Sequence, residues 1–299
     1  MFPPGSVKQF PEKKVAFSNL DKILWPDNGL SKYNLIRYYL EISSYLLPHL
    51  YNRFLVFQRF PEGADQPGFY QKNCPQGAPD WLPRAPFTHG SKITEYVLAD
   101  GPETLAWIGN QACIEIHPWL SPADNPDTPD FAVFDLDPPR GTPFPRVCVV
   151  AAALHDVLLQ KGLRAYPKTS GSRGIQVYLP LLPRYSYEQA RQCVSDLLSD
   201  VHDRLPGETT LERTISRRGD KIYLDAFQNG RGKTIVAPYS PRPLPGAPVS
   251  TPLDWSEIRA MTTPHAPRRN VSFTMKTIGS RLAKRGDLFS PVLWDRQTI

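Results

Sequence analysis

Apolar residues along the chain follow strand-like and helix-like spacings in turn. Short apolar or β-branched runs predict strands at 55–60, 94–98, 112–117, 131–137, 164–167, 175–179 and 222–227. Apolar residues at helical spacing predict helices after Ser31, over 147–159, from Ser186 to Leu198, near 255–261 and around 275–284. The segment 61–92 reads as a long loop, with a further apolar stretch at 105–108. We find no internal repeat or low-complexity linker, so we expect residues 1–299 to form one domain, with room for two intimate lobes.

One predicted strand ends in two carboxylates. Phe131 to Phe134 run into Asp135-Leu136-Asp137, and the pair Pro138-Pro139 then stops the strand. Side chains two apart on a strand share a face, so Asp135 and Asp137 project together. Their mutual repulsion is relieved by a hard divalent cation, often one shared with a phosphate. The alternative is a strand that runs out into a solvated acidic turn.

Glycine-rich basic turns lie near two later strands. The first, 168–174, precedes the strand at 175–179, and its small residues would let backbone N–H groups approach an anion. It is not a Walker A loop, and a plain hairpin turn is the alternative. The basic turn 212–221, for which a solvated loop is the alternative, and the Gly-rich basic turn 228–233 flank a strand with a third carboxylate, Asp225.

Other candidate residues also have structural alternatives. Lys22 and Lys32 flank a turn before a helix start and form a possible anion site, or they are solvated surface lysines. Phe69 and Tyr70 lie in a loop where aromatic rings can stack on bases or simply cover a core. His117 ends a strand, where a histidine is either a ligand-binding or a structural residue.

Composition narrows the classes of function. A net charge of +6 favours a polyanionic partner, and the 33 prolines indicate rigid loops. The four cysteines form no C-x-x-C pair, so the pattern favours neither a zinc site nor a disulfide framework. No apolar run reaches the length of a membrane span, and the first residues lack signal-peptide features. We therefore expect a cytoplasmic protein with no membrane partner.

Together, the three carboxylates and the basic turns suggest phosphoryl chemistry. Two divalent ions held by Asp135, Asp137 and Asp225 would polarise an attacking oxygen and neutralise a leaving pyrophosphate. A nuclease that uses the same metals is the nearest competitor. Cationic loops suited to a triphosphate favour a polymerase over a nuclease.

Several sequence blocks, in order, resemble one family. The blocks are 18–26 (SNLDKILWP), 71–73 (QKN), 77–81 (GAPDW), 135–138 (DLDP), 168–172 (KTSGS), 237–240 (APYS) and 251–253 (TPL). Nearly the whole chain is similar to the polymerase domain of bacterial ligase D and its stand-alone relatives, in the archaeo-eukaryotic primase superfamily.

This resemblance implies an α+β primase fold, in which an RRM-like antiparallel sheet carries the carboxylates and a second α/β lobe is interleaved with it. It implies template-directed nucleotidyl transfer from NTPs or dNTPs with Mn²⁺ or Mg²⁺, preferring ribonucleotides. The implied setting is repair of double-strand breaks by end joining on gapped or broken DNA with a 5′-phosphate. No ligase or phosphoesterase segment is visible, so we expect a separate DNA ligase and Ku as partners, and a place at the nucleoid. A catalytically weak module that binds and bridges DNA ends is the alternative.

The resemblance also implies roles for individual residues. Asp135, Asp137 and Asp225 match the metal ligands. The implied nucleotide-binding residues are His117, Lys168, Ser170, Ser172, Arg173, Gln176 and Arg231. The implied DNA-binding residues are Lys22, Lys32, Phe69, Tyr70, Lys72 and Arg218, with the two lysines on the 5′-phosphate and the two rings near the template. One departure stands out, because the family motif G-S-K-G-L-H reads G-S-R-G-I-Q at 171–176 and places an uncharged Gln176 where the family has histidine.

Overall fold

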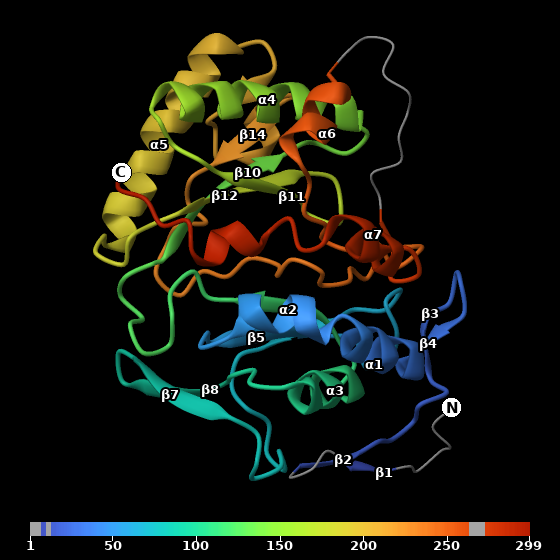
Figure 1. Cartoon of the computed structure of the whole chain (residues 1–299). Helices are drawn as coiled ribbons and strands as arrows, with labels where there is room; N and C mark the ends of the chain where they lie inside the picture. Colours follow the sequence, from blue (N-terminus) through green and yellow to red (C-terminus); the bar gives the residue numbers. More distant parts are fainter. Residues whose placement is uncertain (1–6, 10–12, 263–272) are drawn as a thin grey trace. The chain divides into compact units, whose positions relative to one another are not determined.

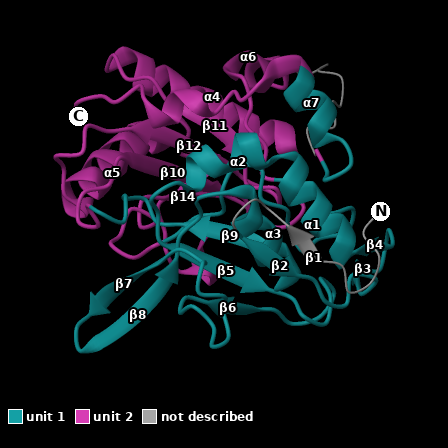
Figure 2. Ribbon diagram, turned by 60° about the horizontal axis from the view of Figure 1, so that its bottom comes forward, with its two compact units in different colours: residues 1–124, 234–249, 274–283 teal, residues 125–233, 250–273, 284–299 magenta. Residues whose placement is uncertain are grey.

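The computed structural model describes residues 7–9, 13–262 and 273–299. The chain forms two compact units, each assembled from three separate segments (Figure 2). Unit 1 comprises 1–124, 234–249 and 274–283, and unit 2 comprises 125–233, 250–273 and 284–299. No helix in these described residues is long and apolar enough to cross a membrane.

Unit 2 is built on a five-stranded sheet in the order β11-β12-β10-β14-β13. The strands are β10 (Phe131–Asp137), β11 (Tyr166–Thr169), β12 (Ile175–Pro180), β13 (Thr209–Thr210) and β14 (Ile222–Asp225). All neighbours are antiparallel except β13 and β14. Helices α4 (Phe144–Gln160) and α5 (Tyr187–Arg204) pack on the sheet (Figure 1), and α6 (Trp255–Ala260) lies against α4. Two 3₁₀ turns, η1 (Ile215–Arg217) and η2 (Ser290–Leu293), complete this unit.

Strand alternation gives this sheet two different faces. Ala132, Phe134 and Leu136 of β10 join the core beneath α4 and α5, and all three are fully buried. The intervening residues of the strand point the other way, so Asp135 and Asp137 lie on the face opposite that core. The apolar face thus anchors the strand that presents the carboxylates.

Unit 1 contains a second sheet around β5 (Leu55–Arg59). Its other strands are β6 (Phe69–Gln71), β7 (Arg84–His89), β8 (Lys92–Val97) and β9 (Cys113–Pro118), with β6, β8 and β9 all paired to β5. Its helices are α1 (Lys32–Glu41), α2 (Ser43–Leu50) and α3 (Pro102–Asn110). Most of α7 (Ile278–Arg285) also belongs to this unit. Short ladders join β1 (Val7–Gln9) to β2 (Lys14–Ala16) and β3 (Ile23–Trp25) to β4 (Leu30–Ser31).

Two predicted helix N-caps, Ser31 and Ser186, are confirmed. Ser31 is the N-cap of α1, and its N–H donates to Asn34 Oδ1 at 2.9 Å. Ser186 and Gln189 form the predicted capping box of α5, through Gln189 N–H to Ser186 Oγ at 3.2 Å and the return bond at 2.8 Å. Helix α5 continues to Arg204, past the predicted end at Leu198.

Several predicted element boundaries were wrong. The predicted loop at 61–92 contains strand β6 and the hairpin strand β7, with β8 already beginning at Lys92. Strand β11 covers Tyr166–Thr169, so Lys168 lies in the sheet rather than in a turn. These strands depend on cross-strand pairing, with β5, β8 or β12, that local sequence does not encode.

Asn229 replaces a strand residue beside β10. After β14 ends at Asp225, the Asn229 side chain accepts the Val133 N–H at 2.7 Å and donates to the Val133 carbonyl at 2.7 Å. Asn229 is 1% exposed. Its amide therefore extends the pairing of β10 past the end of β14 and satisfies buried backbone groups.

Replacing Asn229 with alanine should destabilise the fold, because buried polar groups of Val133 lose their partner. We expect Asn229→Ala to lower the free energy of unfolding in urea by about 2–4 kcal/mol. Gln192→Ala removes an exposed bond to Asp196 and should change it by less than about 0.5 kcal/mol. Equal stability of the two variants would contradict this role of Asn229.

Candidate active site

Four polar side chains form a row across the sheet of unit 2. Register places Lys168 of β11 opposite Gln176 of β12, Gln176 opposite Asp135 of β10, and Asp135 opposite Asp225 of β14. Directly opposed residues in a sheet share a face, so all four project from the side away from the α4–α5 core. Asp137 follows Asp135 on the same face and lies opposite Tyr223. The three carboxylates therefore lie on one face of the sheet. Their joint binding of metal ions stays a prediction.

Asp135 sits at the centre of this negative charge. Burial, together with the charges of Asp225 and Asp137, raises the pKa of Asp135 to about 7. A hydrogen bond from Gln176 and the positive charge of Lys168 oppose that shift in pKa. The Asp135 carboxylate is thus under strong electrostatic pressure to bind a proton or a cation.

Lys168 approaches this charge from the buried edge of the row. Its side chain is 0% exposed, and Nζ donates to Gln176 Oε1 at 2.5 Å and to Ser250 Oγ at 2.8 Å. The Gln176 amide in turn donates to Asp135 Oδ1 at 3.2 Å. The ammonium also lies 5.5 Å from the centre of the Tyr178 ring.

Arginines balance the other end of the cluster. Arg218 approaches Asp137 Oδ2 at 3.5 Å, and Arg173 approaches its Oδ1 at 3.8 Å. The guanidinium of Arg218 stacks on Tyr223 with 3.7 Å to the ring centre. The hydroxyl of Tyr223 donates to Asp225 Oδ1 at 3.3 Å, and burial with the charge of Asp225 raises the pKa of Tyr223 to about 12. Tyr223 therefore stays protonated and joins Arg218 to the carboxylates.

The donor set fits a hard divalent cation, because carboxylate oxygens are the ligands that Mg²⁺ and Mn²⁺ prefer. Within the described residues, no three acidic, histidine or cysteine side chains already stand in metal-binding geometry. Two of the carboxylates have other partners: Asp137 lies near Arg173 and Arg218, and Asp225 Oδ1 accepts the Phe227 N–H at 2.7 Å. A cation at this site would therefore compete with the arginines for Asp137.

The predicted nucleotide turn follows β11. The Ser170 hydroxyl accepts the N–H groups of Ser172 at 3.2 Å and Gly174 at 3.0 Å, so these donors are used within the turn. A Cβ on Gly174 would lie 2.3 Å from the Leu136 carbonyl oxygen, so only glycine fits where the turn meets β10. Ser172 and Arg173 remain exposed on the turn. Their side chains, rather than a cradle of backbone N–H groups, are available to an anion.

His117 belongs to unit 1 and is held by a buried ion cluster. Its Nε2 lies 2.7 Å from Glu115 Oε2, and Arg242 Nε lies 2.9 Å from Glu115 Oε1. Glu115 is 2% exposed, and the Tyr70 ring meets His117 edge-on with 5.8 Å between ring centres. This cluster fixes the orientation of the imidazole through its Nε2 atom.

The predicted DNA-binding lysines lie in unit 1 close to a third cation. Burial lowers the pKa of Lys32, and the charges of Lys22 and Arg59 lower it further. Lys32 is 6% exposed and donates to the Ser18 carbonyl at 2.8 Å, whereas Lys22 pairs with exposed Glu62 at 2.9 Å. Like charges held this close suit an anionic partner.

Strand β6 presents aromatic rings to solvent. Phe69 is 47% exposed and Tyr70 is 60% exposed, and the guanidinium of Arg59 lies 5.4 Å from the centre of the Phe69 ring. Lys72 follows this strand and is also exposed. Large exposed rings beside cations are suited to stacking on nucleobases.

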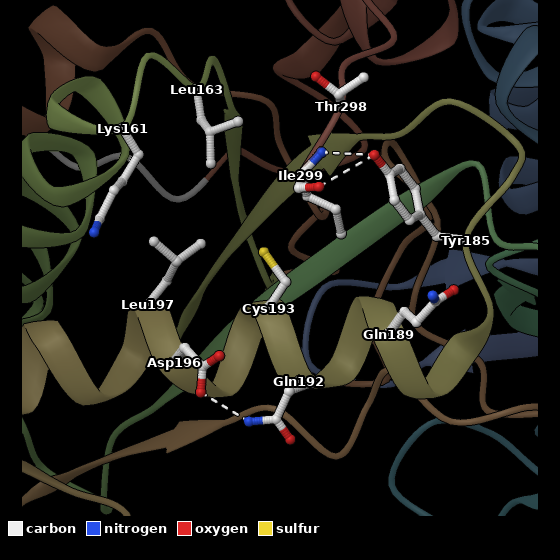
Figure 3. A pocket seen from close by; sticks show the side chains of 10 residues that line it. All are labelled: Lys161, Leu163, Tyr185, Gln189, Gln192, Cys193, Asp196, Leu197, Thr298 and Ile299. Atoms are coloured by element: carbon white, nitrogen blue, oxygen red, sulfur yellow. Dashed lines mark hydrogen bonds between the residues drawn. The ribbon is translucent and has the colours of Figure 1, made fainter.

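Two features of unit 2 lie outside this constellation. Arg231, a predicted nucleotide ligand, pairs with Asp127 at 2.5 Å. A cavity of about 600 Å³ lies between α5 and the last residues of the chain, and its walls include Cys193, Leu197 and Ile299 (Figure 3). Burial raises the pKa of the Cys193 thiol to about 11, so this cysteine is not a nucleophile at neutral pH. None of the predicted site residues lines this cavity.

Sequence analysis missed several supporting residues. Glu115 shares a strand face with His117, a pattern visible in the sequence, but its partner Arg242 is distant along the chain. Tyr223 gave no signal beyond its strand, and Ser250 reaches Lys168 only through tertiary folding. Residues that orient a site from distant segments of the chain cannot be recognised from any local spacing in the sequence.

Comparison with known proteins gives this arrangement a family. The profile described as LigD, primase-polymerase domain matches residues 31–289. The chain belongs to the LigD primase-polymerase domain family. It is 37% identical to the bifunctional non-homologous end joining protein LigD of Bacillus subtilis over 275 residues, which cover 91% of this chain and 43% of that protein. It is 34% identical to a multifunctional LigD of Mycobacterium tuberculosis over 285 residues, which cover 93% of this chain and 37% of that protein.

A solved structure of the same family shares the fold. The polymerase domain of Mycobacterium tuberculosis ligase D, in complex with DNA, matches with a TM-score of 0.87 and 32% identity, over 96% of this chain and 100% of that one. The predicted α+β primase fold is thereby confirmed. The chain spans less than half the length of these two LigD relatives.

The raised pKa of Asp135 predicts a pH-dependent cost in the metal-free protein. An unfolded chain ionises this carboxyl near pH 3.8, whereas the folded protein does so near pH 7. Asp135 therefore costs no stability below the lower pKa, and its cost grows as pH rises through this window. In EDTA, Asp135→Asn should raise the free energy of unfolding by about 1–2 kcal/mol at pH 8. A pKa difference of one between the folded and unfolded states corresponds to about 1.4 kcal/mol. The partial exposure of Asp135 reduces the total cost.

At pH 4 the same substitution should have little effect. Urea unfolding at both pH values measures the difference. Asp156→Asn, an exposed aspartate paired with Arg259, serves as the control and should show no gain at pH 8. A less stable Asp135→Asn protein at pH 8 would contradict the electrostatic account.

Proposed function

We propose that this chain catalyses template-directed nucleotidyl transfer, filling gaps and extending ends during repair of DNA double-strand breaks by end joining. The observation that carries the proposal is the position of Asp135, Asp137 and Asp225 on one face of the sheet. Membership of the LigD primase-polymerase family and the DNA-bound relative support it. The family resemblance adds a preference for ribonucleotides over deoxyribonucleotides.

In this proposal Asp135, Asp137 and Asp225 would hold two Mn²⁺ or Mg²⁺ ions. Such ions would supply Lewis-acid activation of the attacking hydroxyl and charge neutralisation for the leaving pyrophosphate. Arg173 and Ser172 are exposed beside the carboxylates and would bind the triphosphate. Arg218 would leave Asp137 for a phosphate or template contact, and His117, held by Glu115, would contact the nucleotide.

Unit 1 supplies the proposed DNA contacts. Lys22 and Lys32 would bind the downstream 5′-phosphate of a gap, and Phe69 and Tyr70 would stack near the template, with Lys72 on the backbone. We further propose that the chain works at the bacterial nucleoid in the cytoplasm, with Ku and a DNA ligase. The ligase would seal the product that the polymerase leaves.

Nucleotide incorporation on a gapped duplex tests the enzymatic proposal. With Mn²⁺, Asp225→Asn should lower kcat by on the order of 10²–10³-fold, because a metal ligand contributes several kcal/mol. Asparagine at position 225 keeps an acceptor for the Phe227 N–H, so the fold should survive. Asp156→Asn is the matched control and should retain wild-type kcat. Tight binding of gapped DNA without any incorporation by the wild-type protein would favour an end-binding module instead.

Binding of gapped DNA with and without a 5′-phosphate tests the end-recognition proposal. Lys22→Gln should reduce the preference for the phosphorylated end about tenfold, since a hydrogen bond to a charged group contributes roughly 1.5–3 kcal/mol. Glu62→Gln should strengthen that preference, because it frees Lys22 from its partner. Lys161→Gln in unit 2 is the control, and a preference unchanged in all three variants would exclude a role for Lys22.

A further inference from the structure

The side-chain amide of Gln176 accepts one hydrogen bond through its oxygen and donates another through its nitrogen. On one side its Oε1 accepts a hydrogen bond from Lys168 Nζ at 2.5 Å. On the other its Nε2 donates to Asp135 Oδ1 at 3.2 Å. Both partners are its directly paired neighbours in adjacent strands, so the backbone ladder sets these contacts.

The lysine end of this contact is itself fixed. Lys168 is fully buried, and its second contact, Ser250 Oγ, donates onward to the Thr169 carbonyl at 2.8 Å. A lysine held in this way has little freedom to rotate. Lys168 therefore also fixes the orientation of the Gln176 amide, which lies between Lys168 and Asp135.

The exposure of Gln176 argues against a direct contact with nucleotide. Only 6% of the residue is exposed, and both ends of its amide already have partners. On the turn before β12, by contrast, the side chains of Ser172 and Arg173 are exposed. An incoming phosphate would reach those side chains without disturbing the row.

We propose that Gln176 is a positioning residue, whose amide, held by Lys168, aims the Asp135 carboxylate at the cation site instead of binding the nucleotide. The inference rests on the proposed metal-dependent function of the same site. Groups that hydrogen-bond a metal-ligating carboxylate fix its rotamer and direct its free lone pairs at the metal. The contact engages Oδ1 of Asp135 and does not involve Oδ2.

The chemistry of the position predicts which side chains can replace Gln176. A substitute must accept from Lys168 and donate to Asp135. A neutral imidazole does both with its two nitrogens, whereas methionine offers no donor and only a weak acceptor. Gln176→His should therefore preserve the function of Gln176, and Gln176→Met, similar in volume, should remove it.

Mn²⁺ affinity, measured by electron paramagnetic resonance without nucleotide or DNA, tests the proposal. Gln176→Met should raise the Kd for Mn²⁺ about 10–100-fold, the usual effect of losing a partner of a metal ligand. In incorporation assays at saturating Mn²⁺ its kcat should fall, and its KM for nucleotide should change less than about threefold. Gln192→Met, at an exposed glutamine of α5, is the matched control and should behave as wild type.

Gln176→His keeps the test decisive if the methionine variant does not fold. Its Mn²⁺ affinity and kcat should stay within about threefold of wild type, and a tenfold loss of affinity in this variant would overturn the proposal. A folded Gln176→Met protein with unchanged Mn²⁺ affinity would also overturn it. If the KM of that protein for nucleotide rose, Gln176 would be assigned to nucleotide binding instead. If the wild-type protein neither binds Mn²⁺ nor incorporates nucleotides, the proposed function itself fails. If the wild type does both and only the variants disagree, the inference alone fails.

Discussion

Repulsion among three carboxylates on one face of a sheet is the constraint around which unit 2 is organised. The ladder forces Asp135 and Asp225 into direct opposition, and strand alternation adds Asp137 to the same face. The molecule offsets this charge from two sides. Lys168 acts through Gln176 at the buried edge, while Arg218 and Arg173 reach Asp137 from exposed turns. Cations or phosphates bound at this cluster would compete with these arginines.

The opposite face of the same sheet explains why this cluster can be held at all. Packing beneath α4 and α5 buries the alternate residues of β10 completely. A strand anchored by its apolar side chains keeps the intervening aspartates in place despite their repulsion. Asn229 extends the pairing of β10 where β14 has already ended, so the carboxylate-bearing strand stays paired beyond its short neighbour.

How much of this could be predicted depends on the sequence separation of the partners. Strand β10 and its two aspartates were predicted with the correct bounds, because an apolar run, alternation and a Pro-Pro stop are local signals. The helix caps at Ser31 and Ser186 are local for the same reason. Asp225 was predicted as a strand carboxylate, but only the register of β14 places it opposite Asp135. The family resemblance, rather than the local sequence pattern, supported the grouping of Asp225 with Asp135 and Asp137.

Other parts of the site lie beyond any local rule. Lys168 was expected in a turn, and its burial in β11 follows from pairing with β12 and from the distant Ser250. The hairpin of β7 and β8 was expected to be partly a loop, because Pro86 and many exposed residues obscure its alternation. The stacking of Arg218 on Tyr223 requires a turn to fold back on the sheet. Each of these features depends on a tertiary contact, and neither partner in the contact has a distinctive local sequence pattern.

Anomalous X-ray scattering from crystals of this chain soaked with Mn²⁺ tests the central claim most directly. The account predicts manganese peaks within about 2.0–2.3 Å of carboxylate oxygens of Asp135, Asp137 and Asp225, with Arg173 and Arg218 displaced from Asp137. Manganese bound elsewhere, with these carboxylates still paired to the arginines, would contradict it.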